Sequence, residues 1–204
     1  MIEILDVIRK RRSVRKYQPR PVQDKLVKEV LTAAGWAPSA HNAQPWRFII
    51  LPDVLVKREL AEAMAESWAS DFAKDGLNIE PEMLKFRVDR FASAPVLIIA
   101  CLSMDGMDNF SDEKRQKIER DLAMQSVAAA LENIMLAAHA EGLGACWYCA
   151  PAFCRETVRK VLGIPADAEP QALIAMGYPA EAPIVPNKKQ LGDFCFKNKW
   201  GSKF

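Results

Sequence analysis

A cluster of basic side chains near the start of the chain could bind a phosphate. The stretch RKRRSVRKYQPR, residues 9–20, holds seven of the 28 basic residues and no acidic one. Guanidinium groups grip phosphate oxygens through paired hydrogen bonds, and a serine hydroxyl adds a neutral donor. The other 21 basic residues are outnumbered by 26 acidic ones, so the positive charge is local. A nucleic-acid surface needs cations along a whole face, so the pattern favours a pocket for one small anion. A solvated basic face and a nuclear-localisation signal are the alternatives.

A second polar stretch, PSAHNAQPW at residues 38–46, lies between prolines. The side-chain amides of Asn42 and Gln44 each carry a donor and an acceptor, so they could bind the polar edge of a flat heterocycle. The alternative is a turn whose polar groups satisfy one another. The sequence assigns no role to His41.

The segment CWYC, from Cys146 to Cys149, is a CxxC motif. A thioredoxin-like pair would follow the first strand of its fold and open a helix, whereas here Pro151 opens the next helix. A zinc site would need two more ligands, and the remaining cysteines and histidines do not have finger spacing. We therefore expect free thiols and no metal, with a thiol oxidoreductase as the alternative.

The pattern of apolar residues predicts the elements that must position these groups. Helices are expected from residue 4 into the basic stretch, over 22–35, over most of 54–91 with a break at 75–81, over 111–140 and over 151–163. Buried strands are expected over 46–51, 94–102, 142–148 and 170–179. Ser111 is the expected N-cap of the alanine-rich helix, which is apolar on nearly all sides and so should be buried. The fold class is α+β: a small sheet wrapped by helices.

Length and composition indicate one domain spanning residues 1–204. Half of the residues are hydrophobic, 26% are charged and the net charge is +2, which is ordinary for a globular protein. The start of the chain has charges inside its apolar part, and the longest apolar run, residues 94–102, is far shorter than the ~20 residues that span a bilayer. We expect a cytoplasmic protein that binds neither a membrane nor nucleic acid.

In chain order, these motifs resemble those of the FMN-dependent nitroreductase family. Its members carry R-R-S-x-R-x-[FY], A-P-S-x-x-N-x-Q-P-W-x-F, G-L-G-x-x-W, G-Y-P and a basic residue before a leucine. The matching segments of this chain are 11–17, 37–48, 142–147, 177–179 and 188–191. Five motifs in family order make the resemblance specific. The segments SDFAKDGL, PVLIIACLSMDGMDNFSDEKR and GLGACWYCAPAF are similar to the reductase domain fused to the glutamyl ligase of deazaflavin-cofactor biosynthesis.

The resemblance implies a nitroreductase-like sandwich: a mostly antiparallel sheet around a long buried central helix, in an intertwined homodimer. FMN would lie at the subunit interface, and the tail over residues 185–204 would dock on the partner subunit. The residues implied to bind FMN are Arg11, Arg12, Ser13, Arg15, Pro38, Ser39, Asn42, Gln44, Trp147, Tyr148, Cys149, Ala150 and Lys188. Residues 38–44 would come from the partner. Two positions depart from the expected pattern: Cys149 stands where the relative nearest in pattern has glycine, and Lys188 stands where arginine is usual.

The implied activity is a ping-pong transfer of hydride or electrons from NADH or NADPH to a nitro, quinone or enone-like acceptor. The flavin carries this chemistry, so no catalytic side chain is expected. Asp71, within the helices expected to cover the acceptor, is a candidate substrate contact. One alternative is a stand-alone reductase of a dehydro precursor of the deazaflavin. Another is a flavin-binding module without turnover.

Overall fold

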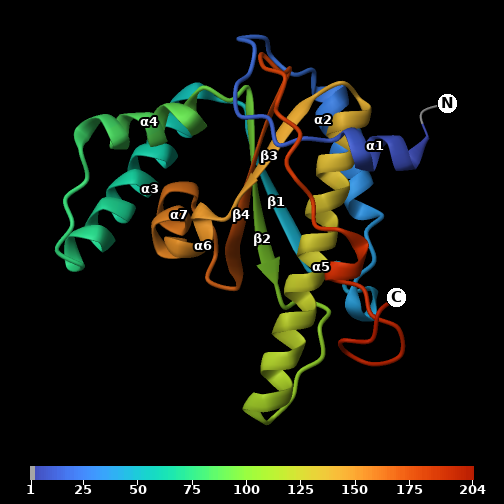
Figure 1. Cartoon of the computed structure of the whole chain (residues 1–204). Helices are drawn as coiled ribbons and strands as arrows, with labels where there is room; N and C mark the ends of the chain where they lie inside the picture. Colours follow the sequence, from blue (N-terminus) through green and yellow to red (C-terminus); the bar gives the residue numbers. More distant parts are fainter. Residues whose placement is uncertain (1–2) are drawn as a thin grey trace.

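The computed structural model describes residues 3–204, and the two residues before them lie outside the description. Its centre is a four-stranded antiparallel sheet in the order β1-β2-β4-β3 (Figure 1). The strands are β1 (Trp46–Leu51), β2 (Val96–Ser103), β3 (Gly144–Tyr148) and β4 (Ala168–Gly177). All four lie where the apolar runs predict strands, and the α+β class is confirmed.

Helices cover both faces of the sheet, so the fold is a three-layer sandwich (Figure 1). One face packs against α2 (Asp24–Gly35) and α5 (Glu113–Ala140), and α1 (Ile4–Lys10) lies beside α5. The other face packs against α3 (Val54–Lys74), α4 (Pro81–Ala92), α6 (Ala150–Phe153) and α7 (Arg155–Leu162). Two short 3₁₀ turns, η1 (Ala40–Asn42) and η2 (Leu191–Asp193), complete the chain.

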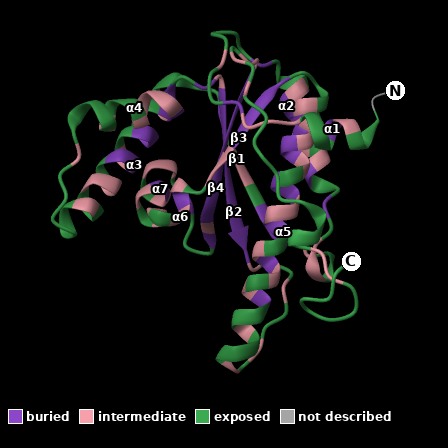
Figure 2. Ribbon diagram, viewed as in Figure 1, coloured by how far each residue is buried: buried purple, intermediate pink, exposed green. Residues whose placement is uncertain are grey.

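The central strand β2 shows why a continuous apolar run was needed. Ile98 and Ala100 face the core under α2 and α5, whereas Leu97 and Ile99 face the core under α3 and α7. Every residue of β2 is buried (Figure 2), because side chains alternate between two covered faces. A strand with one solvated face would instead alternate apolar and polar residues.

Helix α5 is central, but it is buried along one side only, which faces the sheet and α2, at Glu119 and from Ala123 onward. Its first turns extend past the end of the sheet (Figure 1). Their charged sequence EKRQK suits this position in solvent. The N-cap is Asp112 and not Ser111 as predicted: the Asp112 carboxylate accepts a hydrogen bond of 2.9 Å from the Arg115 amide. A carboxylate at this position also interacts favourably with the helix dipole.

The helix predicted over residues 151–163 is two helices, α6 and α7, because the chain bends at Cys154. Cys154 has φ −136° and ψ 47°, outside the helical region, and its amide still closes the first turn onto Pro151. The bend brings Phe153 and Cys154 beside α3 and the end of β3.

A buried lysine joins α3 to the chain that links α4 with β2. The Lys57 ammonium donates to the backbone oxygens of Ala94 at 2.6 Å and Pro95 at 3.0 Å, and the residue is 2% exposed. Burial lowers the pKa of Lys57, opposed by the Asp53 carboxylate. This contact sets where α3 and α4 stand relative to the sheet.

Within residues 3–204, no helix combines the length and the apolar character needed to cross a membrane. The tail after β4 has few regular elements, and its aromatic side chains are largely exposed, with Trp200 at 92%. Its docking on a partner subunit stays a prediction.

Candidate functional site

The basic stretch follows α1 and runs alongside β3, at the edge of the sheet. The Val14 amide donates to the Ala145 oxygen at 3.0 Å, and Ser13 forms a parallel bridge with the same residue. Val14 is buried, whereas Arg15 and Lys16 are exposed. Anchoring the one apolar residue of the stretch therefore leaves its basic neighbours free to face a ligand.

Two glycines make room for this stretch. A Cβ atom added to Gly144 would lie 2.7 Å from side-chain atoms of Val14, which is closer than real contacts allow. A Cβ atom at Gly177 would lie 2.6 Å from the Pro95 ring and 3.1 Å from the Tyr17 ring. The second glycine of the G-L-G motif and the glycine of the G-Y-P motif are thus needed for close packing.

Two polar contacts hold the stretch from its other side. The Tyr17 hydroxyl lies 2.6 Å from the Val14 oxygen and 2.9 Å from the Ala175 oxygen, and burial raises its pKa. The Glu181 carboxylate accepts hydrogen bonds from the amides of Arg15 at 2.8 Å and Lys16 at 3.2 Å. Both contacts fix backbone and leave the guanidinium of Arg15 available.

A groove of about 880 Å³ opens between this stretch, α4 and the tail, and we call it the basic groove. Six of its side chains are basic and two are acidic. The basic ones are Arg11, Arg12, Arg15, Lys16, Arg90 and Lys188. The structure therefore brings together the four predicted residues of the basic stretch and Lys188, which is 173 positions after Arg15 in the chain. Such an excess of cations suits a phosphate.

The first arginines of the groove retain hydrogen-bonding capacity. Among residues 3–204, the buried Nε atoms of Arg11 and Arg12 have no hydrogen-bond partner. Arg11 Nε stands 3.6 Å from a Glu132 oxygen, and Arg12 donates to the backbone oxygens of Arg9 at 2.6 Å and of Arg11 at 2.7 Å. A buried donor without a partner is costly, so Arg12 Nε favours a bound anion, whereas Arg11 Nε has the Glu132 carboxylate as an ion-pair partner.

The end of β3 separates the predicted ring-bordering residues onto two faces. Trp147 packs against the core under α5, whereas Tyr148 packs edge-on against Phe91, with ring centres 5.1 Å apart. Cys149 is exposed and caps α6, which begins at Ala150. Cys146 is a buried free thiol, and none of the five cysteines is in a disulfide. The thiols are free, as expected.

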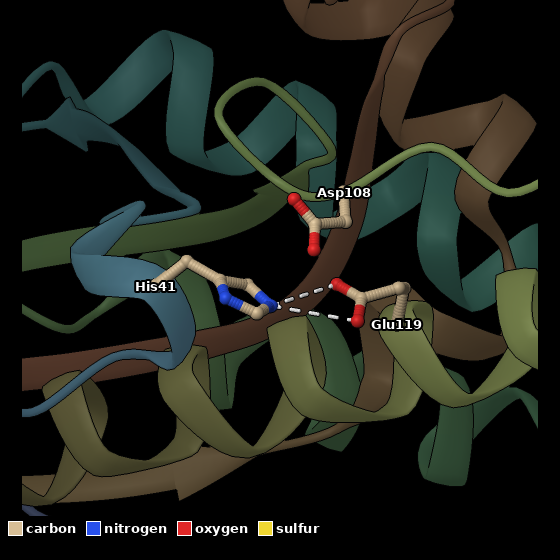
Figure 3. A group of neighbouring side chains, drawn as sticks. All are labelled: His41, Asp108 and Glu119. Atoms are coloured by element: carbon tan, nitrogen blue, oxygen red, sulfur yellow. Dashed lines mark hydrogen bonds and ion pairs between the residues drawn. The ribbon is translucent and has the colours of Figure 1, made fainter.

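The loop over residues 38–44 is held in an unusual conformation. His41, Asn42 and Gln44 have φ values of 55°, 53° and 50°, in the left-handed region that side chains other than glycine rarely adopt. The Ala40 amide donates to the Ser126 hydroxyl, and the Gln44 amide donates to the Ser39 hydroxyl, both at 3.1 Å. Figure 3 shows a third anchor: His41 Nε2 lies 3.2 and 3.4 Å from the two oxygens of Glu119, a buried residue of α5.

This loop and the basic groove lie at opposite ends of the sheet. The Pro45 oxygen accepts from the Ser103 amide at the end of β2, whereas Ser13 pairs through Ala145 and Met176 with Val96 at its start. Seven residues of strand separate the two ends, about 20 Å. Pro38, Ser39, Asn42 and Gln44 therefore cannot reach the groove of their own chain.

Comparison with known proteins places the chain in a family. The family model described as "Nitroreductase family" matches residues 8–178. The chain belongs to the nitroreductase family. A Methanothermobacter thermautotrophicus protein whose name combines NADH dehydrogenase and NAD(P)H nitroreductase is 35% identical over 186 residues, which are 89% of this chain and 80% of that protein. A Thermus thermophilus NADH dehydrogenase is 33% identical over 183 residues, 84% of each chain. Membership of the family makes the protein an oxidoreductase.

Solved structures confirm the nitroreductase fold. A Desulfovibrio desulfuricans protein in complex with FMN has a TM-score of 0.74 and 26% identity, covering 98% of this chain and 99% of that one. A BluB-like flavoprotein from Clostridium difficile has a TM-score of 0.77 at 24% identity, covering 98% of this chain and all of that one. The second likeness, at this identity, concerns the fold alone.

The structure adds residues of α4 that the motifs did not indicate. Phe86, Asp89 and Arg90 line the basic groove, and Arg90 also lines a neighbouring cavity together with Asp71 of α3. The only sequence signal was the i, i+4 spacing of Phe86 and Arg90, whose guanidinium lies 4.6 Å from the ring centre. Asp71 bonds to Lys74 at 2.8 Å, and its contact with a substrate stays a prediction.

Three possible metal-ligating groups meet beside the strained loop. The ligand atoms of His41, Asp108 and Glu119 lie within 4.8 Å of one another (Figure 3). The His41–Glu119 contact already explains how the loop is held. The expectation that this nitroreductase-family chain binds no metal stays a prediction.

The close packing of Gly144 against Val14 yields a test. We expect Gly144→Ala to displace the basic stretch and lower the unfolding free energy by about 1–3 kcal/mol, because the new Cβ overlaps Val14. Urea denaturation measures the change. The double variant Val14→Ala/Gly144→Ala should be less destabilised than the sum of the single changes, because it removes both overlapping Cγ atoms of Val14 and leaves only its Cβ. Gly35→Ala, where a Cβ would meet nothing within 4 Å, is the control. Equal effects at Gly144 and Gly35 would refute the packing role.

Proposed function

We propose that this chain is an FMN-dependent oxidoreductase that passes electrons from NADH or NADPH to a small organic acceptor. The observation that carries the proposal is the basic groove, where five predicted FMN-binding residues converge with the unpartnered buried Nε atom of Arg12. Relatives named for NADH or NAD(P)H and a similar structure in complex with FMN support the same conclusion.

The residues present fit FMN. Arg11, Arg12 and Lys188 would bind its phosphate, and Ser13 would add a hydroxyl donor. Arg15 would lie at the pyrimidine edge of the ring, where a fixed cation stabilises negative charge. The backbone from Trp147 to Ala150 would border the ring, with the side chains of Trp147 and Tyr148 on opposite faces of the sheet. Lysine at position 188 retains the charge but not the two-pronged geometry of arginine.

When bound, FMN supplies the two-electron redox chemistry of the reaction. In the overall reaction a reduced nicotinamide gives up a hydride, and a quinone takes it with one proton from solvent to become a hydroquinone. We infer that donor and acceptor occupy the same site in turn. The protein's part is to hold, orient and shield the reacting molecules.

We infer that the complete site needs two copies of this chain. The loop over residues 38–44 is about 20 Å from the groove of its own chain, by the length of β2. Its strained backbone is nevertheless held by three separate anchors, which suggests that its conformation serves a ligand. Large apolar side chains are exposed on α1, after α2 and on the tail, among them Ile4 at 62%, Trp36 at 83% and Trp200 at 92%. Such a surface suits a subunit interface.

A second acceptor follows from the sequence similarity to the reductase domain of the deazaflavin glutamyl ligase. In that role the chain would reduce a dehydro precursor of the deazaflavin. The same groove would hold FMN, and only the acceptor would differ. The alternative of another class is a non-catalytic module that binds flavin without turnover.

The proposed activity predicts the behaviour of the purified protein. It should be yellow, or become so with FMN, and lose its colour on anaerobic addition of NADH or NADPH; a quinone should then restore the colour. Absorbance near the flavin band records each step. A protein that binds no FMN would overturn the proposal, and one that binds FMN but is reduced by neither nicotinamide would be a binding module.

Cys146→Ala should retain turnover, whereas a CxxC thiol enzyme would lose it.

Arg12 offers a test of the phosphate assignment. We expect Arg12→Ala to weaken FMN binding by about 10- to 100-fold, because one charge-assisted pair with the phosphate is lost. Riboflavin, which lacks the phosphate, should bind both proteins equally well. Arg9→Ala, an exposed cation one helical turn earlier, is the matched control. Equal losses for FMN and riboflavin would show that Arg12 acts only by holding the carbonyls at the end of α1.

Mixed dimers test whether the site is shared. Arg12→Ala and Asn42→Gly should each impair FMN binding; glycine at position 42 accepts the positive φ and removes only the amide. A heterodimer carrying one change in each subunit should regain about one intact site, because both changes then fall in one of the two shared sites and leave the other site unchanged. Titration of differently tagged, co-expressed subunits with FMN counts the sites. No recovery in the heterodimer would place both residues in one chain's site.

A further inference from the structure

A cavity of about 460 Å³ lies between α3, α4 and α6, and we call it the aromatic cavity. Five aromatic side chains line it: Trp68, Phe72, Phe91, Tyr148 and Phe153. Trp68 and Phe72 contact each other at 4.7 Å between ring centres, and Phe91 and Tyr148 at 5.1 Å. A cavity of this size and lining suits a planar molecule of one or two rings.

Two guanidinium groups, of Arg87 and Arg90, enter the same cavity from α4. The Arg87 guanidinium carbon lies 3.4 Å from the centre of the Trp68 ring, and that of Arg90 lies 5.9 Å from the centre of the Tyr148 ring. The aromatic faces thus hold both groups in place without neutralising them.

No acid of the described chain, residues 3–204, forms an ion pair with either guanidinium. The nearby carboxylates are engaged elsewhere: Asp89 with Arg58 at 3.8 Å, and Asp71 with Lys74 at 2.8 Å. Burial, and then the like charge of Arg90, lower the pKa of Arg87. Two adjacent cations in an apolar wall repel each other, and an anion between them would relieve that repulsion.

The aromatic cavity is a neighbour of the basic groove. Arg90 lines both, and Cys149 and Ala150, at the predicted border of the flavin ring, line the cavity. A molecule in the cavity would therefore lie beside a flavin held in the groove.

We propose that the aromatic cavity selects planar aromatic acceptors that carry a carboxylate or a similar anionic group, held by Arg87 and Arg90. The description of this ligand as the acceptor rests on the proposed function; the anion site itself does not. With 4-nitrobenzoate as acceptor, NADH and one proton would yield the nitroso compound, NAD⁺ and water, a balanced two-electron reduction. The aromatic rings contact the acceptor's ring, and the guanidinium groups set its orientation.

Binding of redox-inert probes tests the anion site apart from turnover. By calorimetry, we expect 2-naphthoate to bind the FMN-loaded protein about tenfold tighter than neutral 2-naphthamide, because its carboxylate makes one charge-assisted contact that the amide does not make. Arg87→Gln should abolish that preference. Lys85→Gln, which removes an exposed cation from the same helix, should preserve it. Equal affinities for the two probes, or equal effects of the two substitutions, would overturn the proposal.

Kinetics then test the acceptor. The ratio of kcat/KM for 4-nitrobenzoate to that for nitrobenzene should fall about tenfold in Arg87→Gln, with FMN content unchanged. Arg87→Lys retains the charge and provides a second variant, which should keep part of the ratio if Arg87→Gln folds poorly. An unchanged ratio would overturn the proposal. Preferential binding of 2-naphthoate by a protein without turnover would instead refute only the proposed function.

Discussion

The seating of Val14 against the edge of β3 is the contact on which the candidate site depends. One backbone hydrogen bond to Ala145 fixes the register of the basic stretch, and this approach is possible only because Gly144 has no side chain. Glu181 holds the next two amides from the opposite side. Burial of one apolar side chain therefore determines where the surrounding arginines point.

The sheet distributes the parts of the site over its two ends. The basic groove lies where β2 begins, and the strained loop lies where β2 ends. The loop has a left-handed backbone, and Glu119, Ser126 and Ser39 all hold it in place. This separation agrees with the proposed shared site, in which each subunit of a symmetric pair would supply one part of each site.

Helix α4 connects the two halves of the proposed chemistry. Its residues Phe86 and Arg90 face the basic groove, while Arg87 and Arg90 face the aromatic cavity. The Lys57 ammonium holds the end of this helix in place, because it donates to the backbone oxygens of Ala94 and Pro95, which follow the helix. The position of α4 therefore determines the shape of both the basic groove and the aromatic cavity.

The sequence by itself determined the elements and the family: continuous apolar runs predicted all four strands, and two of the five motifs predicted five residues of the groove, Arg11, Arg12, Ser13, Arg15 and Lys188. It did not determine the N-cap at Asp112 or the bend at Cys154, because neighbouring residues could serve equally well locally. Only the tertiary structure decided that Lys188 meets the basic stretch, that residues 38–44 do not, and that Arg87 lies unpaired beside Trp68. These are contacts between segments distant in the chain, set by strand register and helix packing, which no local pattern of residue types encodes.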